Sequence, residues 1–171
     1  MPLLTIVSPM PGAERRFKPF VEFVQAAGWE AEFVRLDWPD RQPNFESTAL
    51  FPQVDAQTAG KIVMGFSLGA VYSHLGALRA RRLILGSISP FFLEDDDEPQ
   101  RWMISYRAGN SDTPAEVLVG ALEDAQMHRR ATAVRDFYRQ ASYTVVPDAE
   151  HELWHPSYLN AIKAALDRAG A

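Results

Sequence analysis

Short runs of apolar residues recur along the chain, and most of them are separated by stretches with helical spacing. The runs are rich in Val, Ile and Leu, and nearly every position in them is apolar, which is typical of strands buried on both faces of a parallel sheet. These runs cover residues 3–8, 31–37, 61–67, 81–87, 116–122 and 142–147. The pattern therefore predicts about six strands.

Helices are predicted between most of these runs. Apolar residues recur at helical spacing from Phe17 to Val24, and Gly28 then favours the end of that helix. The same spacing marks three further helices, at Val71, Leu75 and Leu78, at Val134, Phe137 and Tyr138, and at Leu159, Ile162 and Leu166. An alternation of strand and helix predicts an α/β fold, a three-layer α/β/α sandwich with helices on both faces of a mostly parallel sheet.

Two segments depart from this alternation. Residues 44–60 contain Pro52 in their middle, and we expect a short irregular helix there. Residues 88–115 carry an acidic run from Glu94 to Glu98, which is typical of a solvated surface loop.

Length and composition limit the possible classes of protein. A chain of 171 residues is expected to form a single domain over residues 1–171. The net charge of -5 argues against nucleic acid as a partner, because phosphate binding needs a basic face. The absence of Cys excludes disulfides and thiol chemistry. The N-terminus has no basic segment typical of a signal peptide, and no apolar run is long enough to span a membrane, so we expect a cytoplasmic protein.

A glycine-flanked serine stands where the third predicted strand meets a predicted helix. The sequence there is Gly65-Phe66-Ser67-Leu68-Gly69. A serine between a strand and a helix must turn sharply, and glycines on both sides let the two backbones approach closely. This context predicts that the Ser67 hydroxyl is exposed above the sheet as a nucleophile.

The chain resembles the α/β-hydrolase family from its first strand to its last helix. In that family a nucleophile, an acid and a histidine follow one another in this order along the chain. The resemblance implies Ser67 as the nucleophile. "TVVPDAEHELW" is similar to the family's final strand and loop, and implies His151 as the general base.

The acid has two candidates within "VLVGALEDAQM", which resembles the family's acid turn. Glu123 stands three residues after Gly120, where the family has Asp, and Asp124 follows it. Either carboxylate could orient the histidine and stabilise its protonated form. We favour Asp124 slightly, because "DAQM" resembles the family's continuation, and expect the other carboxylate to sit at a helix N-terminus.

An oxyanion hole requires backbone N–H donors near the serine. The resemblance implies the amide of Leu68 as the first donor and places the second in the loop after the first strand. Many members have His-Gly in that loop, whereas this chain reads "SPMPG". Pro9 and Pro11 have no N–H, so the amide of Met10 is the second candidate.

"HELWH", residues 151–155, also matches the H-E-x-x-H pattern of zinc peptidases. In those enzymes both histidines lie on one helix, but Pro156 follows His155 directly and suits the first turn of a helix that begins there. We therefore predict that His151 and His155 lie in a loop and that no metal is bound. His155 could line the mouth of the pocket or cap the last helix, and we favour capping.

These features predict a serine hydrolase that cleaves small carboxylic esters or thioesters without a cofactor. No insertion large enough for a lid lies between the serine and the acid, so we expect an open site facing a small-molecule substrate, with no membrane partner. Phe66 and Trp154 are candidates for substrate contact, together with Met10, Phe91, Phe92, Trp102 and Leu153. Two alternatives stay open: a catalytically inactive binding module with this fold and, with less support, a zinc peptidase.

Overall fold

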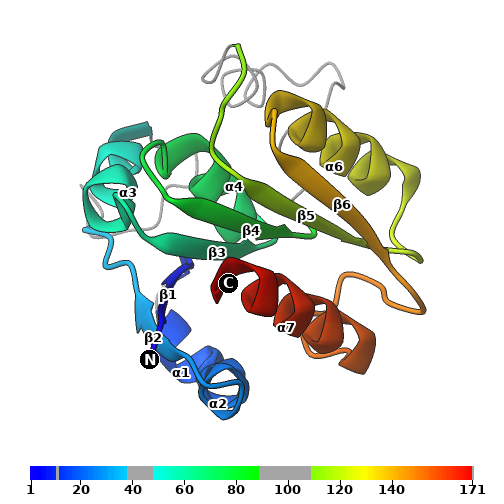
Figure 1. Cartoon of the computed structure of the whole chain (residues 1–171), viewed down its shortest axis with the longest axis horizontal. Helices are drawn as coiled ribbons and strands as arrows, with labels where there is room; N and C mark the ends of the chain where they lie inside the picture. The colour runs from blue at the N-terminus through cyan, green and yellow to red at the C-terminus, as the bar shows by residue number, and fades with distance from the viewer. Residues whose placement is uncertain (11, 38–47, 89–108, 171) are drawn as a thin grey trace.

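The computed structural model describes residues 1–10, 12–37, 48–88 and 109–170. Its centre is a six-stranded sheet in the order β2-β1-β3-β4-β5-β6, with every neighbouring pair parallel (Figure 1). The strands are β1 (Leu3–Val7), β2 (Glu30–Phe33), β3 (Ile62–Phe66), β4 (Arg82–Gly86), β5 (Ala115–Gly120) and β6 (Ala141–Val146). Each predicted run overlaps one of them, so the prediction of about six strands is confirmed.

Helices cover both faces of the sheet, which confirms the three-layer prediction. In Figure 1, α2 and α7 lie on one side of the sheet, with α1 beside α2, and α3, α4 and α6 lie on the other. The helices are α1 (Ala13–Arg16), α2 (Lys18–Ala26), α3 (Phe51–Thr58), α4 (Leu68–Gly76), α6 (Ala125–Phe137) and α7 (Pro156–Gly170), with a short 3-10 helix η1 (Thr48–Leu50) before α3. Among the described residues, no helix is both long and apolar enough to cross a bilayer.

Some predicted boundaries need correction. The helix after Ser67 ends at Gly76, before Leu78, because Ala77 leaves the helical conformation with ψ 59°. The irregular helix expected within residues 44–60 is confirmed over its described part as η1 and α3. The acidic run from Glu94 to Glu98 lies outside the described residues, as do Phe91, Phe92 and Trp102.

Alternate residues of the central strands fill two apolar layers. Val63, Leu83 and Val117 pack under α3, α4 and α6, whereas Met64 and Leu118 face α2 and α7. All of these side chains are at most 2 % exposed. Burying each such side chain contributes about 1.5–3 kcal/mol, so the parallel sheet is stabilised from both sides.

The chain after β2 is held by side-chain amides instead of a further strand. Gln57 of α3 accepts from Arg35 N–H at 2.9 Å and donates to Arg35 O at 2.7 Å. Gln53 bonds Asp37 in the same way, at 2.9 and 3.0 Å. This explains why β2 is shorter than the predicted run at 31–37: its backbone groups find partners on a helix.

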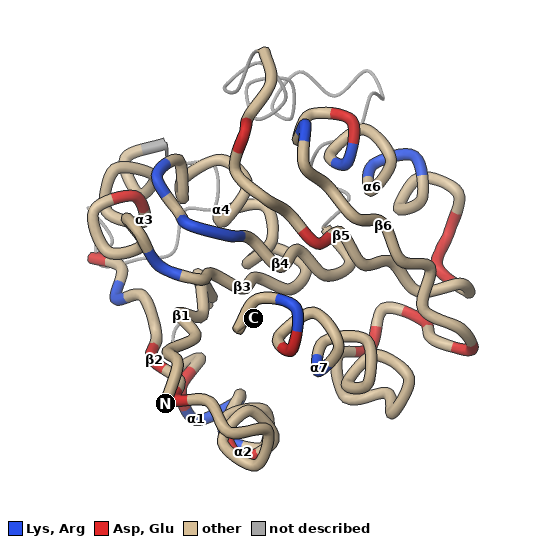
Figure 2. The backbone as a smooth tube through the Cα atoms, viewed as in Figure 1, with Lys and Arg blue, Asp and Glu red and all other residues tan. Residues whose placement is uncertain are grey.

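A buried carboxylate ties three elements together at the start of β5. Glu116 bonds Arg82 of β4 at 3.2 Å, Arg168 of α7 at 2.9 Å and the hydroxyl of Ser142. Figure 2 shows basic positions on β4 and near the C-terminal end of α7, and an acidic position on β5. Burial acts to raise the pKa of Glu116, but the hydrogen bonds from Arg168 and Ser142 and the positive charges of the two arginines outweigh it and lower that pKa. The ionised form of Glu116 therefore stabilises the fold.

Replacing Glu116 by Gln should lower the free energy of unfolding at pH 7 by about 1–3 kcal/mol. Since the folded pKa is lowered, this contribution is present above the unfolded pKa and is lost as the pH falls through the folded one. Urea unfolding of wild type and Glu116→Gln at pH 7 and at about pH 3.5 should show the difference shrinking with acidity.

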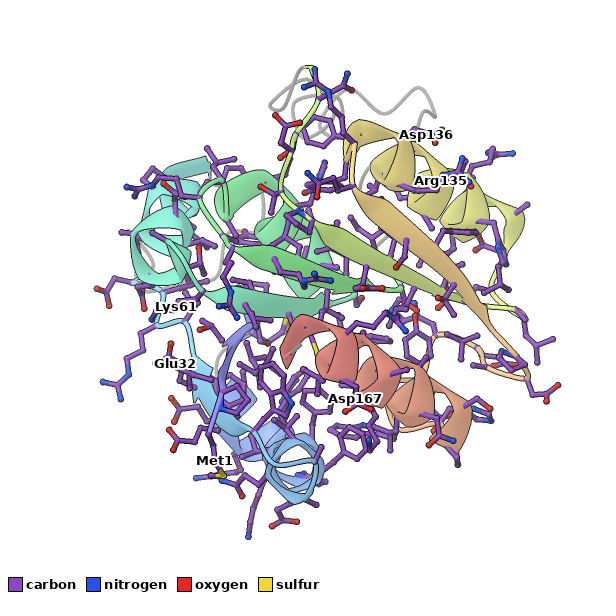
Figure 3. All side chains as sticks on the ribbon, in the orientation of Figure 1. Met1, Glu32, Lys61, Arg135, Asp136 and Asp167 are labelled. Carbon is purple, nitrogen blue, oxygen red and sulfur yellow. The ribbon has the colours of Figure 1, made fainter. Side chains whose placement is uncertain are left out.

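Glu32→Gln is the matched control, because Glu32 and Lys61 form a half-exposed pair at 2.7 Å, side by side in Figure 3. An exposed ion pair stabilises a protein by about 0–1 kcal/mol, so the free energy of unfolding should fall less in Glu32→Gln than in Glu116→Gln. An equal decrease of the free energy of unfolding in both variants would contradict the role given to Glu116.

Candidate active site

Ser67 occupies a sharp turn between β3 and α4. Its backbone has φ 55° and ψ −123°, a conformation that residues other than Gly rarely adopt. A Cβ added at Gly65 would lie 2.2 Å from the carbonyl oxygen of Gly69, and one added at Gly69 would lie 2.3 Å from that of Val7. Only glycine fits at either position, so the strand-turn-helix arrangement predicted from the sequence is confirmed.

His151 lies between the serine and a carboxylate. Its Nε2 is 2.8 Å from Ser67 Oγ, and its Nδ1 is 3.2 Å from Glu123 Oε1. The histidine side chain is 42 % exposed, whereas that of Glu123 is 1 % exposed. With Nδ1–H donating to the carboxylate, Nε2 has a free lone pair that can accept the serine proton.

Short backbone contacts fix the loop that carries His151. The amides of Ala121 and Leu122 donate to the carbonyls of Val146 and Ala149 at 2.8 and 3.0 Å. A Cβ added at Gly120 would lie 2.4 Å from Ala149 O, so the end of β5 touches the loop directly. The acid turn and the histidine loop are therefore held as one unit.

The two acid candidates have separate positions, and the preference for Asp124 needs correction. Asp124 is the N-cap of α6, and its Oδ1 accepts the N–H of Met127 at 2.9 Å. This hydrogen bond turns the Asp124 carboxylate toward the helix amides, as is favourable at a helix N-terminus. Glu123, one residue earlier and one methylene longer, is the carboxylate that reaches His151.

A second serine contacts Glu123 from behind and a tyrosine contacts that serine, and sequence reasoning missed both. Ser87 Oγ donates to Glu123 Oε1, and the hydroxyl of Tyr158 is 2.5 Å from Ser87 Oγ. Burial, and to a smaller extent the charge of Glu123, raises the pKa of Tyr158, although its hydrogen bond to Ser87 acts in the opposite direction. The only sequence signal was a serine directly after the strand that neighbours β3.

The candidate oxyanion donors follow two neighbouring strands. Leu68 is the first residue of α4, where a backbone N–H has no acceptor within the helix. Met10 comes shortly after β1, whose Val7 pairs with Gly65 of β3. The carbonyl of Met10 accepts the N–H of Ala13 at 3.2 Å, which helps to hold this loop. Both amides thus belong to turns at the same edge of the sheet.

The two residues predicted to contact substrate lie in different surroundings. Phe66 is partly buried, with its ring 5.2 Å from that of His151 and 5.3 Å from that of Tyr158. Trp154 is 40 % exposed and packs on Phe17 and Phe20 at 6.0 and 6.3 Å, so its aromatic contacts are with the N-terminal helices. Leu153, another candidate, is buried in the core.

An open cavity of about 340 Å³ adjoins the histidine and the acid. Its lining residues are Leu122, Glu123, Asp124, Met127, Glu150 and His151. Leu122 is 62 % exposed and apolar, and sequence reasoning did not single it out. The cavity offers a small, partly apolar space next to the imidazole.

The HELWH segment does not form a zinc-binding helix. Residues 151–155 lie in a turn, and α7 begins at Pro156, as predicted. His155 Nδ1 accepts the N–H of Ser157 at 3.3 Å, which confirms the predicted capping role. Within the described ranges, no group of three or more His, Cys, Asp or Glu side chains could hold a metal ion.

Comparison with known proteins identifies the fold. No protein-family model and no curated protein matches the sequence. Three solved structures that are similar over almost the whole chain share 14 % sequence identity with it. They are an α/β hydrolase from the metagenome of lagoon sediments at Mar Chica, Morocco (TM-score 0.70, 99 % of this chain and 91 % of that one), Est1E from Butyrivibrio proteoclasticus with bound ferulic acid (0.70, 99 % and 88 %) and a monoacylglycerol lipase from Paleococcus ferrophilus (0.62, 98 % and 93 %). The chain therefore has the α/β-hydrolase fold, as its resemblance to that family implied.

The close approach at Gly69 can be tested by substitution. Ala usually stabilises a helix by about 1 kcal/mol relative to Gly. At position 69 the added Cβ would meet backbone, so Gly69→Ala should instead lower the free energy of unfolding by about 3 kcal/mol, or prevent folding. Gly109→Ala is the control, since φ is 87° there but no atom of the described residues lies within 4 Å of the added Cβ, and it should lower the free energy of unfolding by only about 1–2 kcal/mol. A Gly69→Ala protein as stable as wild type in urea would refute the contact.

Proposed function

We propose that this protein is a serine hydrolase that cleaves small carboxylic esters or thioesters. The hydrogen-bonded series of Ser67, His151 and Glu123 carries the proposal, with 2.8 Å between serine and imidazole and 3.2 Å between imidazole and carboxylate. A nucleophile, a base and an orienting acid in this geometry are the groups that acyl transfer through a covalent intermediate requires.

The proposed reaction has two steps, acylation of Ser67 and hydrolysis of the acyl-enzyme. Ser67 Oγ attacks the acyl carbon while His151 Nε2 takes the hydroxyl proton, and the proton then passes to the leaving alcohol or thiol as its bond to the acyl carbon breaks. Water next attacks the acyl-enzyme while His151 takes a proton from that water. The proton then passes to Ser67 Oγ as the carboxylic acid product is released. Glu123 keeps the imidazole in one tautomer and stabilises its charged form.

The oxyanion formed in each step needs N–H donors. We assign this role to the amides of Leu68 and Met10, which belong to turns after β3 and β1. The contact between Gly69 and Val7 supports the assignment, because it locks the two turns against each other.

The space beside the site supports the proposed substrate class. The cavity of about 340 Å³ suits a small acyl or leaving group, and Leu122 and Met127 supply its apolar lining. The ferulic acid bound to Est1E and the name of the monoacylglycerol lipase agree with ester chemistry on this fold. No cofactor takes part in the proposed steps.

A fluorophosphonate probe tests the nucleophile directly. The wild-type protein should be labelled at Ser67, and Ser67→Ala should not be labelled, because only an activated serine reacts with this probe. A panel of p-nitrophenyl esters and the matching thioesters, from acetyl to longer acyl groups, should show the highest kcat/KM at short chains. An intact protein that neither reacts nor hydrolyses any of them would instead support a binding module that lacks turnover.

The identity of the acid can be tested with a pair of variants. Glu123→Gln keeps the size of the side chain but removes its charge, and should lower kcat by about 10²- to 10⁴-fold with little loss of stability. Asp124→Ala removes the N-cap, and should lower the free energy of unfolding by about 1 kcal/mol while kcat changes by less than about tenfold. Steady-state kinetics and urea unfolding of both variants would reveal the reverse pattern if Asp124 were the acid.

A further inference from the structure

We propose that Ser87 and Tyr158 are positioning residues for this reaction. Their hydroxyl groups form a hydrogen-bonded chain that holds the ionised carboxylate of Glu123 and directs it at His151. This inference rests on the proposed serine hydrolase function, and it adds two residues that do not touch the reacting atoms.

The position of Ser87 is fixed by its backbone. It follows β4, its N–H donates to Leu118 O at 2.8 Å, and its side chain is fully buried. Its φ of 42° lies in the left-handed region, which costs a residue other than Gly about 1–2 kcal/mol. A serine held in this conformation with its hydroxyl on a buried carboxylate points to a role for that hydroxyl.

The number of hydroxyl hydrogens determines which group donates in each hydrogen bond between Tyr158, Ser87 and Glu123. Ser87 and Tyr158 each have one hydroxyl hydrogen. When Glu123 is ionised it only accepts, so Ser87 donates to Oε1, and Tyr158 donates to Ser87 Oγ across the 2.5 Å contact. Both hydrogens then point toward the carboxylate. Glu123 Oε1 therefore receives the Ser87 hydroxyl and the His151 Nδ1–H together.

The opposite direction would suit a protonated carboxyl group. Glu123 would then donate to Ser87, Ser87 to Tyr158, and Tyr158 to the carbonyl of Leu118, which lies 3.2 Å from its hydroxyl. Loss of the hydroxyl hydrogen of Ser87 or Tyr158 therefore removes support from the ionised form, which is the form that His151 needs.

The charged surroundings of Glu123 make these neutral donors important. Among the described residues, His151 is the only basic side chain that forms an ion pair or hydrogen bond with Glu123, and Asp124 and Glu150 line the adjoining cavity. Glu123 Oε2 is buried and has no hydrogen-bond partner among the described residues. Burial raises the pKa of Tyr158, so its hydroxyl stays protonated and can donate throughout the neutral range.

Three variants separate the hydroxyl groups from packing. Tyr158→Phe keeps the ring that packs edge-on against Phe66 at 5.3 Å. Ser87→Ala removes the hydroxyl, and Ser87→Gly removes it while also relieving the positive φ. We expect each variant to lower kcat for a short p-nitrophenyl ester by about 10- to 100-fold with little change in KM. Recovery of activity in Ser87→Gly would show that only the backbone matters and would overturn the proposal.

A double-mutant cycle shows whether the hydroxyl acts through Glu123. In the Glu123→Gln background, Ser87→Ala should change kcat by less than about twofold, because the charge it supports is already absent. Additive losses in the cycle would indicate a purely structural role.

A readout independent of turnover separates this proposal from the proposed function. Proton NMR should show a downfield resonance for His151 Nδ1–H in wild type and in Ser67→Ala, and that resonance should shift in Ser87→Ala and Tyr158→Phe. A wild-type protein without probe labelling or hydrolysis would end the hydrolase proposal. An active wild type whose resonance and kcat are unchanged in these variants would end only the inference about Ser87 and Tyr158.

Discussion

The close backbone contacts at the carboxyl edge of the sheet are the constraint on which the site depends. Gly65, Gly69 and Gly120 each touch a neighbouring backbone at a distance that leaves no room for a Cβ. The first two bring β3, α4 and the end of β1 together at the serine, and the third joins the acid turn to the histidine loop. Ser67 and His151 are 84 residues apart in sequence, and their hydrogen bond is 2.8 Å long. Both turns must be held in place, because a small displacement of either one breaks this bond.

The order of the strands determines the order of the functional groups. Ser67, Ser87, Glu123 and His151 follow β3, β4, β5 and β6, which are neighbours in the sheet. In a parallel sheet all carboxyl ends meet at one edge, so four turns bring four polar side chains into a small region. Ser87 follows β4, which lies between β3 and β5 in the sheet, and this is why it can contact Glu123 from behind.

Sequence patterns predicted the groups that depend on local structure. The strands, the serine turn and the position of HELWH before α7 follow from apolar runs, glycines and Pro156, all of which act over a few residues. The acid depends on which of two adjacent side chains turns inward, and this is decided by the hydrogen bond that Asp124 makes to α6. Trp154 and Ser87 have partners distant in sequence, at Phe17 and Tyr158, and a local pattern carries no information about such contacts.

Two carboxylates at opposite ends of one strand have different partners, and this difference explains which of them suits the role of the acid in the proposed reaction. Glu116, at the start of β5, is neutralised by Arg82 and Arg168, so its charge is not available to another group. Glu123, just after the end of β5, has two neutral hydroxyls in line behind it and one imidazole in front. Helix α7 contributes to both ends, through Arg168 and Tyr158. A guanidinium at Glu123 would compete with the imidazolium for the same charge, whereas a hydroxyl chain holds the carboxylate and leaves that charge to act on His151.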